Sequence, residues 1–175
     1  MIGQTFQTKH CGPATVAAYK NRDNVWVVFT NTGHTLKTTK ARLVKSDRPA
    51  LRDPLAPSVF GVGCIGTGEH KAHHKGADTK PYQTWRAMMR RCYYRSAKHH
   101  QPSYEGVTVC DAWRNFQAFA TWYAEHYPTD GGSYQLDKDA RDISAKCYSP
   151  ETCAFVTQRE NLAARRRAGR HAVSR

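Results

Sequence analysis

The sequence predicts an α+β protein with a small SH3-like β module at the N-terminus and an α+β domain after it. Three observations predict this class. Short runs of β-branched and aromatic residues recur among the first 50 or so positions, separated by polar turns. Two later segments place apolar side chains at helical spacing. Near the end, two extended segments precede a polar helix. At 175 residues, the chain can hold one domain or two small ones.

The N-terminal module is expected over residues 1–55. The runs Thr15–Tyr19, Val25–Phe29 and Thr35–Thr38 are separated by turn clusters at 21–24 and 31–33, which is typical of a small curled sheet or barrel. The module could bind DNA or only brace the rest of the chain. Its basic candidates for DNA contacts are Lys37, Lys40, Arg42 and Lys45.

Residues 56–80 resemble a linker, with the domain boundary near 50–60, because glycine and proline interrupt every helix or strand pattern there. The sequence His70-x-x-His73-His74 could bind a metal adventitiously. The alternative is a loop that becomes more cationic at low pH.

Residues 81–167 are expected to form the C-terminal domain, with amphipathic helices at 81–97 and 110–127 and a short strand within 104–109. Arg86 and Arg90 lie off the apolar stripe of the first helix, where they could contact phosphates or simply be solvated. Pro128 ends the second helix. The expected core side chains are Tyr82, Trp85, Met88, Met89, Cys92 and Tyr93 from the first helix, and Trp113, Phe116, Phe119, Ala120, Tyr123 and Tyr127 from the second.

The net charge of +13 favours a polyanionic partner, nucleic acid before membrane, although excess charge can also serve solubility alone. No apolar run is long enough to span a bilayer, and the start lacks the features of a signal peptide. We therefore expect a soluble intracellular protein without a membrane partner. Its six cysteines should be reduced and partly buried.

Charge is distributed unevenly along the chain. Residues 101–157 carry eight acidic and four basic side chains, whereas residues 158–175 carry one acidic and six basic ones. The acidic segment could hold a cation beside a phosphate or be an ordinary solvated surface. The basic end, with its tail at 168–175, could bind phosphates or be a solvated tail. Its candidates are Arg165, Arg166, Arg167 and Arg170.

Four motifs occur in a fixed order: Tyr82-Gln-Thr-Trp85 with Met89-Arg-Arg-Cys-Tyr93, Gly106-Val-Thr-Val-Cys-Asp-Ala-Trp113, Leu136-Asp-Lys-Asp139, and Tyr148-Ser-Pro-Glu-Thr-Cys153. This series resembles phage and mobile-element proteins related to HNH homing endonucleases. The resemblance covers roughly residues 80–167. It implies double-stranded DNA as partner, an HNH-like ββα element that binds metal near residues 134–167, and an accessory role for the N-terminal module.

Carried over by position, the resemblance gives Asp137, Lys138 and Asn161 as candidate catalytic residues. Lys138 stands where the family has its catalytic histidine, and an ammonium group is no general base near pH 7 unless burial lowers its pKa by several units. Thr152 aligns near the asparagine that orients that base. Arg165 takes the place of a metal ligand, and a guanidinium does not bind metal.

Asp137 and Asp139 are the candidate ligands of a divalent metal, Mg or Mn, because hard oxygen donors suit such ions. Two apart on a regular strand, they would face the same side, and His126, His99 or His100 would have to supply the base. Alternatively they are exposed acids balanced by Lys138 and Arg141. A structural Zn site is not favoured, because Cys110, Cys147 and Cys153 include no CxxC pair.

Two functional hypotheses follow. The first is a phage-type DNA-binding protein of HNH-endonuclease ancestry that could also nick or cleave DNA with a divalent metal. The second is a catalytically inactive interaction protein that binds a host or phage protein. If the protein is encoded by a phage, its expected location is the cytoplasm of the host cell.

Overall fold

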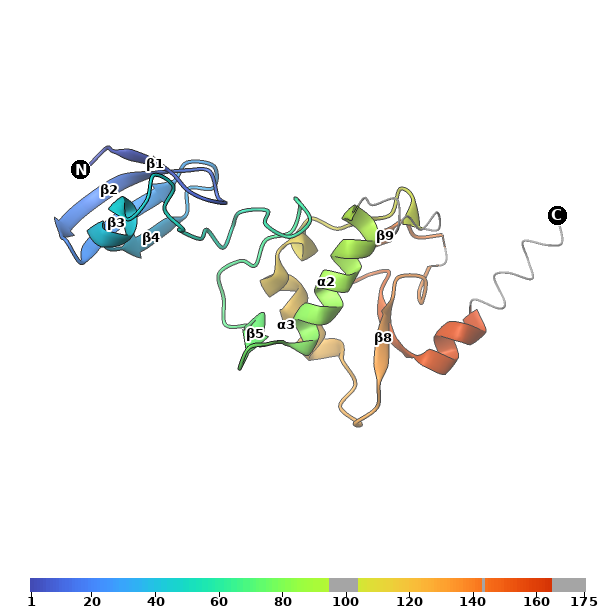
Figure 1. Ribbon diagram of the computed structural model, residues 1–175. Coiled ribbons are helices and arrows are strands. Elements are labelled where there is room, and N and C mark those ends of the chain that lie inside the picture. Colours follow the sequence, from blue (N-terminus) through green and yellow to red (C-terminus); the bar gives the residue numbers. More distant parts are fainter. Residues whose placement is uncertain (95–103, 143, 165–175) are drawn as a thin grey trace. The chain divides into compact units, whose positions relative to one another are not determined.

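The computed structural model describes residues 1–94, 104–142 and 144–164. The chain divides into two compact units, Met1–Thr67 and Gly68–Arg175. Helices and several small sheets make it a mixed α+β protein, as the sequence predicted at the level of the α+β class (Figure 1). Within the described ranges, no helix has the length and apolar character needed to cross a membrane.

The first unit is built on one antiparallel sheet in the order β1-β2-β3-β4. Its strands are β1 (Thr5–Gln7), β2 (Pro13–Asn21), β3 (Asn24–Phe29) and β4 (Thr35–Thr38). Side chains of β3 alternate between buried and half-buried along its whole length, as expected for a strand with one face on the core. The three strands expected from the sequence are present, and β1 was not anticipated.

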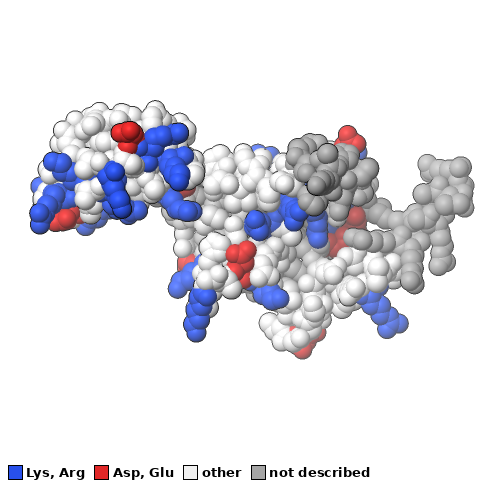
Figure 2. Space-filling view, viewed as in Figure 1, with Lys and Arg blue, Asp and Glu red and all other residues white. Residues whose placement is uncertain are grey.

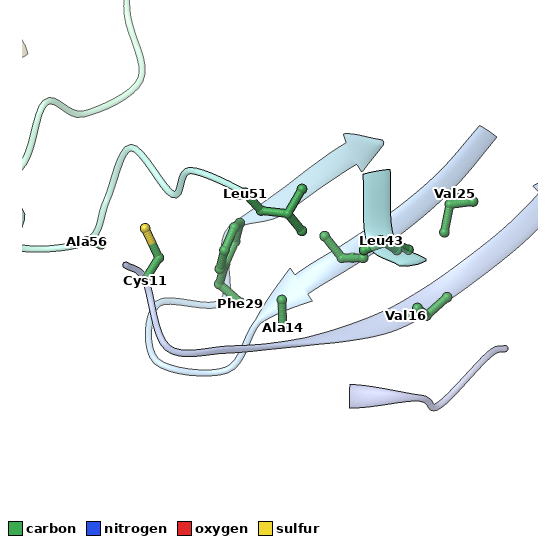
Figure 3. Close-up of a cluster of buried hydrophobic side chains, with 9 residues drawn as sticks. Cys11, Ala14, Val16, Val25, Phe29, Leu43, Leu51 and Ala56 are labelled. Atoms are coloured by element: carbon green, nitrogen blue, oxygen red, sulfur yellow. The ribbon is translucent and has the colours of Figure 1, made fainter. Parts of the chain in front are cut away.

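The core of the first unit lies on one face of this sheet (Figure 3). Val16, Val25 and Phe29 come from the strands, and Leu43 comes from the short helix α1 (Lys40–Val44). Leu51 and Ala56 pack against the same cluster. The unit therefore continues past the expected boundary near 50–60 and ends at Thr67, because its core needs apolar side chains from the segment that resembled a linker.

The second unit begins with a tight hairpin of β5 (His73–His74) and β6 (Ala77–Asp78). Lys75 and Gly76, both with positive φ, form its two-residue turn. His73 Nδ1 lies 2.7 Å from Asp78 Oδ1, and His70 Nε2 lies 3.1 Å from Thr121 Oγ1. His70 and His73 therefore contact different partners. The segment 68–80, which was expected to belong to a linker, is part of the second unit.

Helix α2 (Lys80–Tyr93) follows its N-cap residue Thr79 and has a proline in its first turn, where the missing N–H has no intrahelical role. The apolar stripe predicted for this helix is buried at Tyr82, Trp85, Met88, Met89 and Cys92. The helix ends at Tyr93, before the predicted end at residue 97, because Tyr94 is extended. Residues 95–97 lie outside the described part of the chain.

The predicted second helix is two elements, η2 (Ala112–Arg114) and α3 (Phe116–His126). Asn115 separates them: it is extended, and its side-chain oxygen accepts a hydrogen bond from the Gln117 N–H at 2.9 Å. This N-cap starts a new helix. Phe116, Phe119 and Tyr123 are buried as expected, and α3 packs against α2.

Two small sheets complete the second unit. β7 (Thr108–Val109) pairs in parallel with β9 (Cys147–Tyr148). β8 (Tyr134–Asp137) pairs antiparallel with β10 (Ala154–Thr157), so that Asp137 lies opposite Ala154. β10 leads directly into a helix whose described part covers residues 158–164. Two antiparallel strands followed by a helix therefore occupy the segment where the ββα element was expected.

A capping box starts this last helix. The Thr157 hydroxyl accepts a hydrogen bond from the Glu160 N–H at 3.3 Å, and the Glu160 carboxylate accepts one from the Thr157 N–H at 2.7 Å. Each side chain thereby satisfies a backbone donor of the other residue. These bonds from the Thr157 backbone and hydroxyl lower the pKa of Glu160.

We expect Thr157→Ala to lower the free energy of unfolding by about 1 kcal/mol, measured by urea denaturation at neutral pH. Thr129→Ala, at an exposed threonine of the same unit, is the control.

The contribution of Glu160 to the free energy of unfolding should depend on pH. It should be complete above the usual glutamate pKa and should fall as the pH drops through the lowered pKa of Glu160 in the folded state. A Glu160→Gln variant with the same pH dependence as wild type would contradict this assignment.

Candidate functional site

A small pocket of about 130 Å³ in the second unit brings the predicted site residues together. Asp137, Lys138 and Asp139 line it from the end of β8, and Asn161 lines it from the following helix. Arg91, Tyr104 and Tyr148 form other parts of its wall. Four residues predicted from the sequence thus line one cavity, together with six that were not predicted as site residues.

The two aspartates do not sit on a regular strand, as had been expected. β8 ends at Asp137, and residues 138–140 form a bend. The Asp139 N–H donates to Asp137 Oδ1 at 2.9 Å, a local bond by which aspartate typically stabilises turns. The two carboxylates reach the same pocket because the chain turns there and not because of strand alternation.

Lys138 is held in place by two acceptors. Its ammonium group donates to the Asp139 carboxylate and, at 3.0 Å, to the Ala145 carbonyl oxygen. The side chain is only 12% exposed, against 41% for Asp139. The alternative to a metal site was a pair of exposed acids balanced by basic residues, and such a balance is present between Lys138 and Asp139. Arg141 instead donates to the Pro150 carbonyl oxygen at 3.1 Å.

Asn161 joins the last helix to β8. Its side-chain N–H donates to Gln135 Oε1 at 3.0 Å, which fixes the start of the helix over the strand that carries Asp137. The residue is half-buried and lines the pocket. Its amide oxygen is a further neutral acceptor beside the two carboxylates.

Two other candidates lie outside the pocket lining. The Thr152 hydroxyl donates to the Cys147 carbonyl at 2.7 Å and accepts from the Ser149 N–H at 3.1 Å, so that it stabilises the turn before β10. His126 Nδ1 lies 2.9 Å from the Trp122 carbonyl oxygen, and its ring stacks on Trp122. His99, His100 and Arg165 are outside the described residues.

Oxygen donors dominate the site. Asp137 and Asp139 supply two carboxylates and Asn161 an amide, which fits Mg²⁺ or Mn²⁺ better than a soft thiolate-binding ion. In the part of the chain that is described, no cluster of three or more His, Cys, Asp or Glu side chains has the arrangement of a metal site. Asp137 and Asp139 are thus a pair of potential ligands.

All six cysteines are unpaired. Burial raises the pKa of Cys92 to about 12 and that of Cys153 to about 11. The expected partial burial is confirmed, since Cys11, Cys92 and Cys153 are buried and the other three are half-buried.

The basic candidates for DNA contacts are exposed wherever the structure describes them. Lys40 and Arg42 are on α1, and Arg86 and Arg90 are on the solvent side of α2. Residues 1–67 carry nine Lys or Arg and three acids, and Figure 2 shows more Lys and Arg than Asp and Glu side chains on the visible face of that unit. Arg165, Arg166, Arg167 and Arg170 fall outside the described part.

Sequence reasoning missed Arg91, Tyr104 and Tyr148 as site residues. Arg91 lies off the apolar stripe of α2, as Arg86 and Arg90 do, so that its sequence position did not separate it from them. Tyr148 belongs to a motif of the resemblance, but it is only 1% exposed, and its pattern is that of a core residue.

Comparison with known proteins does not supply a function: no protein-family model, curated protein or solved structure matches this chain. The function is therefore inferred from the pocket, the elements that form it and the charge around it.

Proposed function

We propose that this chain is a double-stranded DNA-binding protein of HNH-endonuclease ancestry, of the type found in phages and mobile elements. One observation carries the proposal. Asp137, Lys138 and Asn161, the residues that the resemblance assigns to the site, line a single pocket formed by β8 and the helix that follows β10. A strand pair followed by a helix is the order expected of an HNH-like ββα element.

Electrostatics supports DNA as the partner. The net charge is +13, and a polyanion gains affinity by releasing counterions from its phosphates. We propose that the first unit is an SH3-like accessory module that adds contacts through Lys40 and Arg42. A four-stranded antiparallel sheet followed by a short helix supports this reading.

A mobility-shift titration on duplex DNA across a salt series tests the proposal. A protein that makes six to ten phosphate contacts loses about 10³–10⁵ in affinity between 50 and 200 mM salt, and we expect a loss on that scale. An affinity for duplex that is absent, or flat against salt, would contradict DNA binding and favour the interaction protein that binds a host or phage protein.

Lys40→Gln provides a site-specific form of this test. We expect the slope of log affinity against log salt to become shallower by about 0.9, the value for one phosphate contact. Arg22→Gln is the matched control in the same unit, because Arg22 already faces Asp23 at 3.4 Å and its charge is partly offset. Equal changes in both variants would contradict a specific contact at Lys40.

Metal-dependent nicking is a second candidate function, favoured by the two carboxylates in the pocket. Asp137, Asp139 and Asn161 would hold the ion, which would supply polarisation of the phosphate and stabilisation of the leaving oxygen. The chain's own contribution is positional: Lys138 holds Asp139, and the Asp139 N–H holds Asp137. Supercoiled plasmid with Mg²⁺, Mn²⁺ or a chelator tests for nicking.

A further inference from the structure

Arg91 lines the pocket, although the resemblance assigns it no role in the site. It is carried by α2, whose apolar stripe is packed into the core on both sides of it at Met88 and Cys92. The backbone that carries Arg91 is therefore fixed by packing. Its side chain lines the same cavity as Asp137 and Lys138.

Two phenols line the pocket together with the guanidinium, those of Tyr148 and Tyr104. Both act electrostatically on Arg91. Burial raises the pKa of Tyr148 well above its usual value, so that its phenol stays neutral. A guanidinium has five N–H donors, and a neutral phenol accepts from it without cancelling its charge.

Arg91 differs in this respect from Lys138. The Lys138 ammonium is paired with the Asp139 carboxylate. Within residues 1–94, 104–142 and 144–164, no acidic side chain forms an ion pair with Arg91. Of the two cations that line the pocket, Arg91 is the one whose charge is available to an incoming anion.

Both cations lie near the same end of α2. The Cys92 thiol, whose pKa is raised chiefly by burial, is acted on in the opposite direction by the positive charges of Arg91 and Lys138. An anion that entered the pocket beside Arg91 would therefore also meet the field of Lys138. The carboxylate of Asp137, which lines the same pocket, disfavours a second anion.

We infer that Arg91 is the anchor for one phosphodiester group of a nucleic-acid backbone, and that Tyr148 is the positioning residue that aims its guanidinium. The inference rests on the proposed function and deepens it, because it names the ligand group and the residue that holds it. A guanidinium fork matches two phosphate oxygens, and the pocket of about 130 Å³ suits a group of that size.

Duplex binding by Arg91→Met, Arg91→Lys and Tyr148→Phe tests the anchor. We expect Arg91→Met to lower affinity about tenfold or more, as for loss of a charge-assisted hydrogen bond, and to make the salt slope shallower by about 0.9. Arg91→Lys should restore the slope but not the affinity, because a lysine lacks the fork. Tyr148→Phe should keep the salt slope but lower the affinity, because Arg91 keeps its charge and only the position of its guanidinium is no longer fixed.

Arg114→Met is the charge-matched control, since Arg114 pairs with Asp111 at 3.1 Å and should leave the slope unchanged. Circular dichroism would verify that each variant folds. If wild type binds duplex and Arg91→Met binds with the same affinity and slope, the anchor is overturned while DNA binding stands.

A probe without DNA separates the two proposals. In a titration with inorganic phosphate, the Nε–H resonance of Arg91, assigned by its absence in Arg91→Met, should shift and saturate. Saturable shifts support the anchor even if duplex binding fails, and a resonance that does not move overturns it even if duplex binding succeeds.

Discussion

Replacing Trp85 with alanine is expected to unfold the second unit and leave the first unit folded. The Trp85 side chain is fully buried, with ring centroids 5.8 Å from Tyr82 and 5.6 Å from Phe116. Its indole N–H donates to the Trp113 carbonyl at 2.6 Å. Loss of a large core aromatic costs about 3–5 kcal/mol, and a buried carbonyl left without a donor adds about 1–3 kcal/mol. Together these approach the whole stability of a small domain.

Amide hydrogen exchange read by mass spectrometry measures this prediction for each unit separately. Protection should collapse in α2 and α3 and persist in β2 and β3. Trp85→Phe, which keeps a ring but loses the N–H, should give an intermediate loss. Trp26→Ala, at a half-buried tryptophan of the first unit, is the control: any loss of protection should be confined to the first unit, and α2 and α3 should stay protected. Protection lost equally from both units would contradict two independent cores.

Helix faces were the most predictable part of the fold, because an apolar stripe reports burial directly. Every residue from Tyr82 to Cys92 that the spacing assigned to the core is buried. The ends were less predictable, since they depend on single residues. Asn115 starts α3 through a side-chain cap, and an asparagine before an apolar run is a signal that the sequence does contain.

Short elements of the first unit were missed for a different reason. α1 has five residues and buries only Leu43, so that it has no periodicity to detect. Ala56 appeared to belong to a linker because its partners in the core cluster on β2 and β3 are distant in sequence. Local patterns do not show such packing.

Part of the site could be predicted and part could not. The sequence located Asp137, Lys138, Asp139 and Asn161, which share one pocket. It did not place Arg91 with them, because Arg91 reaches the pocket through the packing of α2 and through Tyr148. The expected placement of both aspartates on a regular strand was also wrong, since β8 ends at Asp137 and Asp139 lies in the bend that follows.

Asp137→Asn is expected to lower any Mg²⁺- or Mn²⁺-dependent nicking of supercoiled plasmid by about 10²–10³-fold, the scale of losing several kcal/mol of metal-based charge stabilisation. The substitution removes the negative charge but keeps an oxygen that can accept from the Asp139 N–H. The bend should therefore survive, and duplex binding in the presence of a chelator should be unchanged. A loss confined to the metal-dependent step would identify Asp137 as a ligand and not as a structural residue.

Asp142→Asn is the matched control, because Asp142 lies in the same loop but accepts from Ser144 and does not line the pocket. Nicking at the wild-type rate by Asp137→Asn would place the metal elsewhere.

Since Lys138 is tied to Asp139 and to the Ala145 carbonyl, it is not arranged to accept a proton from water. Lys138→Met should consequently disturb the Asp139 side of the pocket, lowering activity less than Asp137→Asn does. A larger loss in Lys138→Met would instead assign the lysine a direct role at the phosphate.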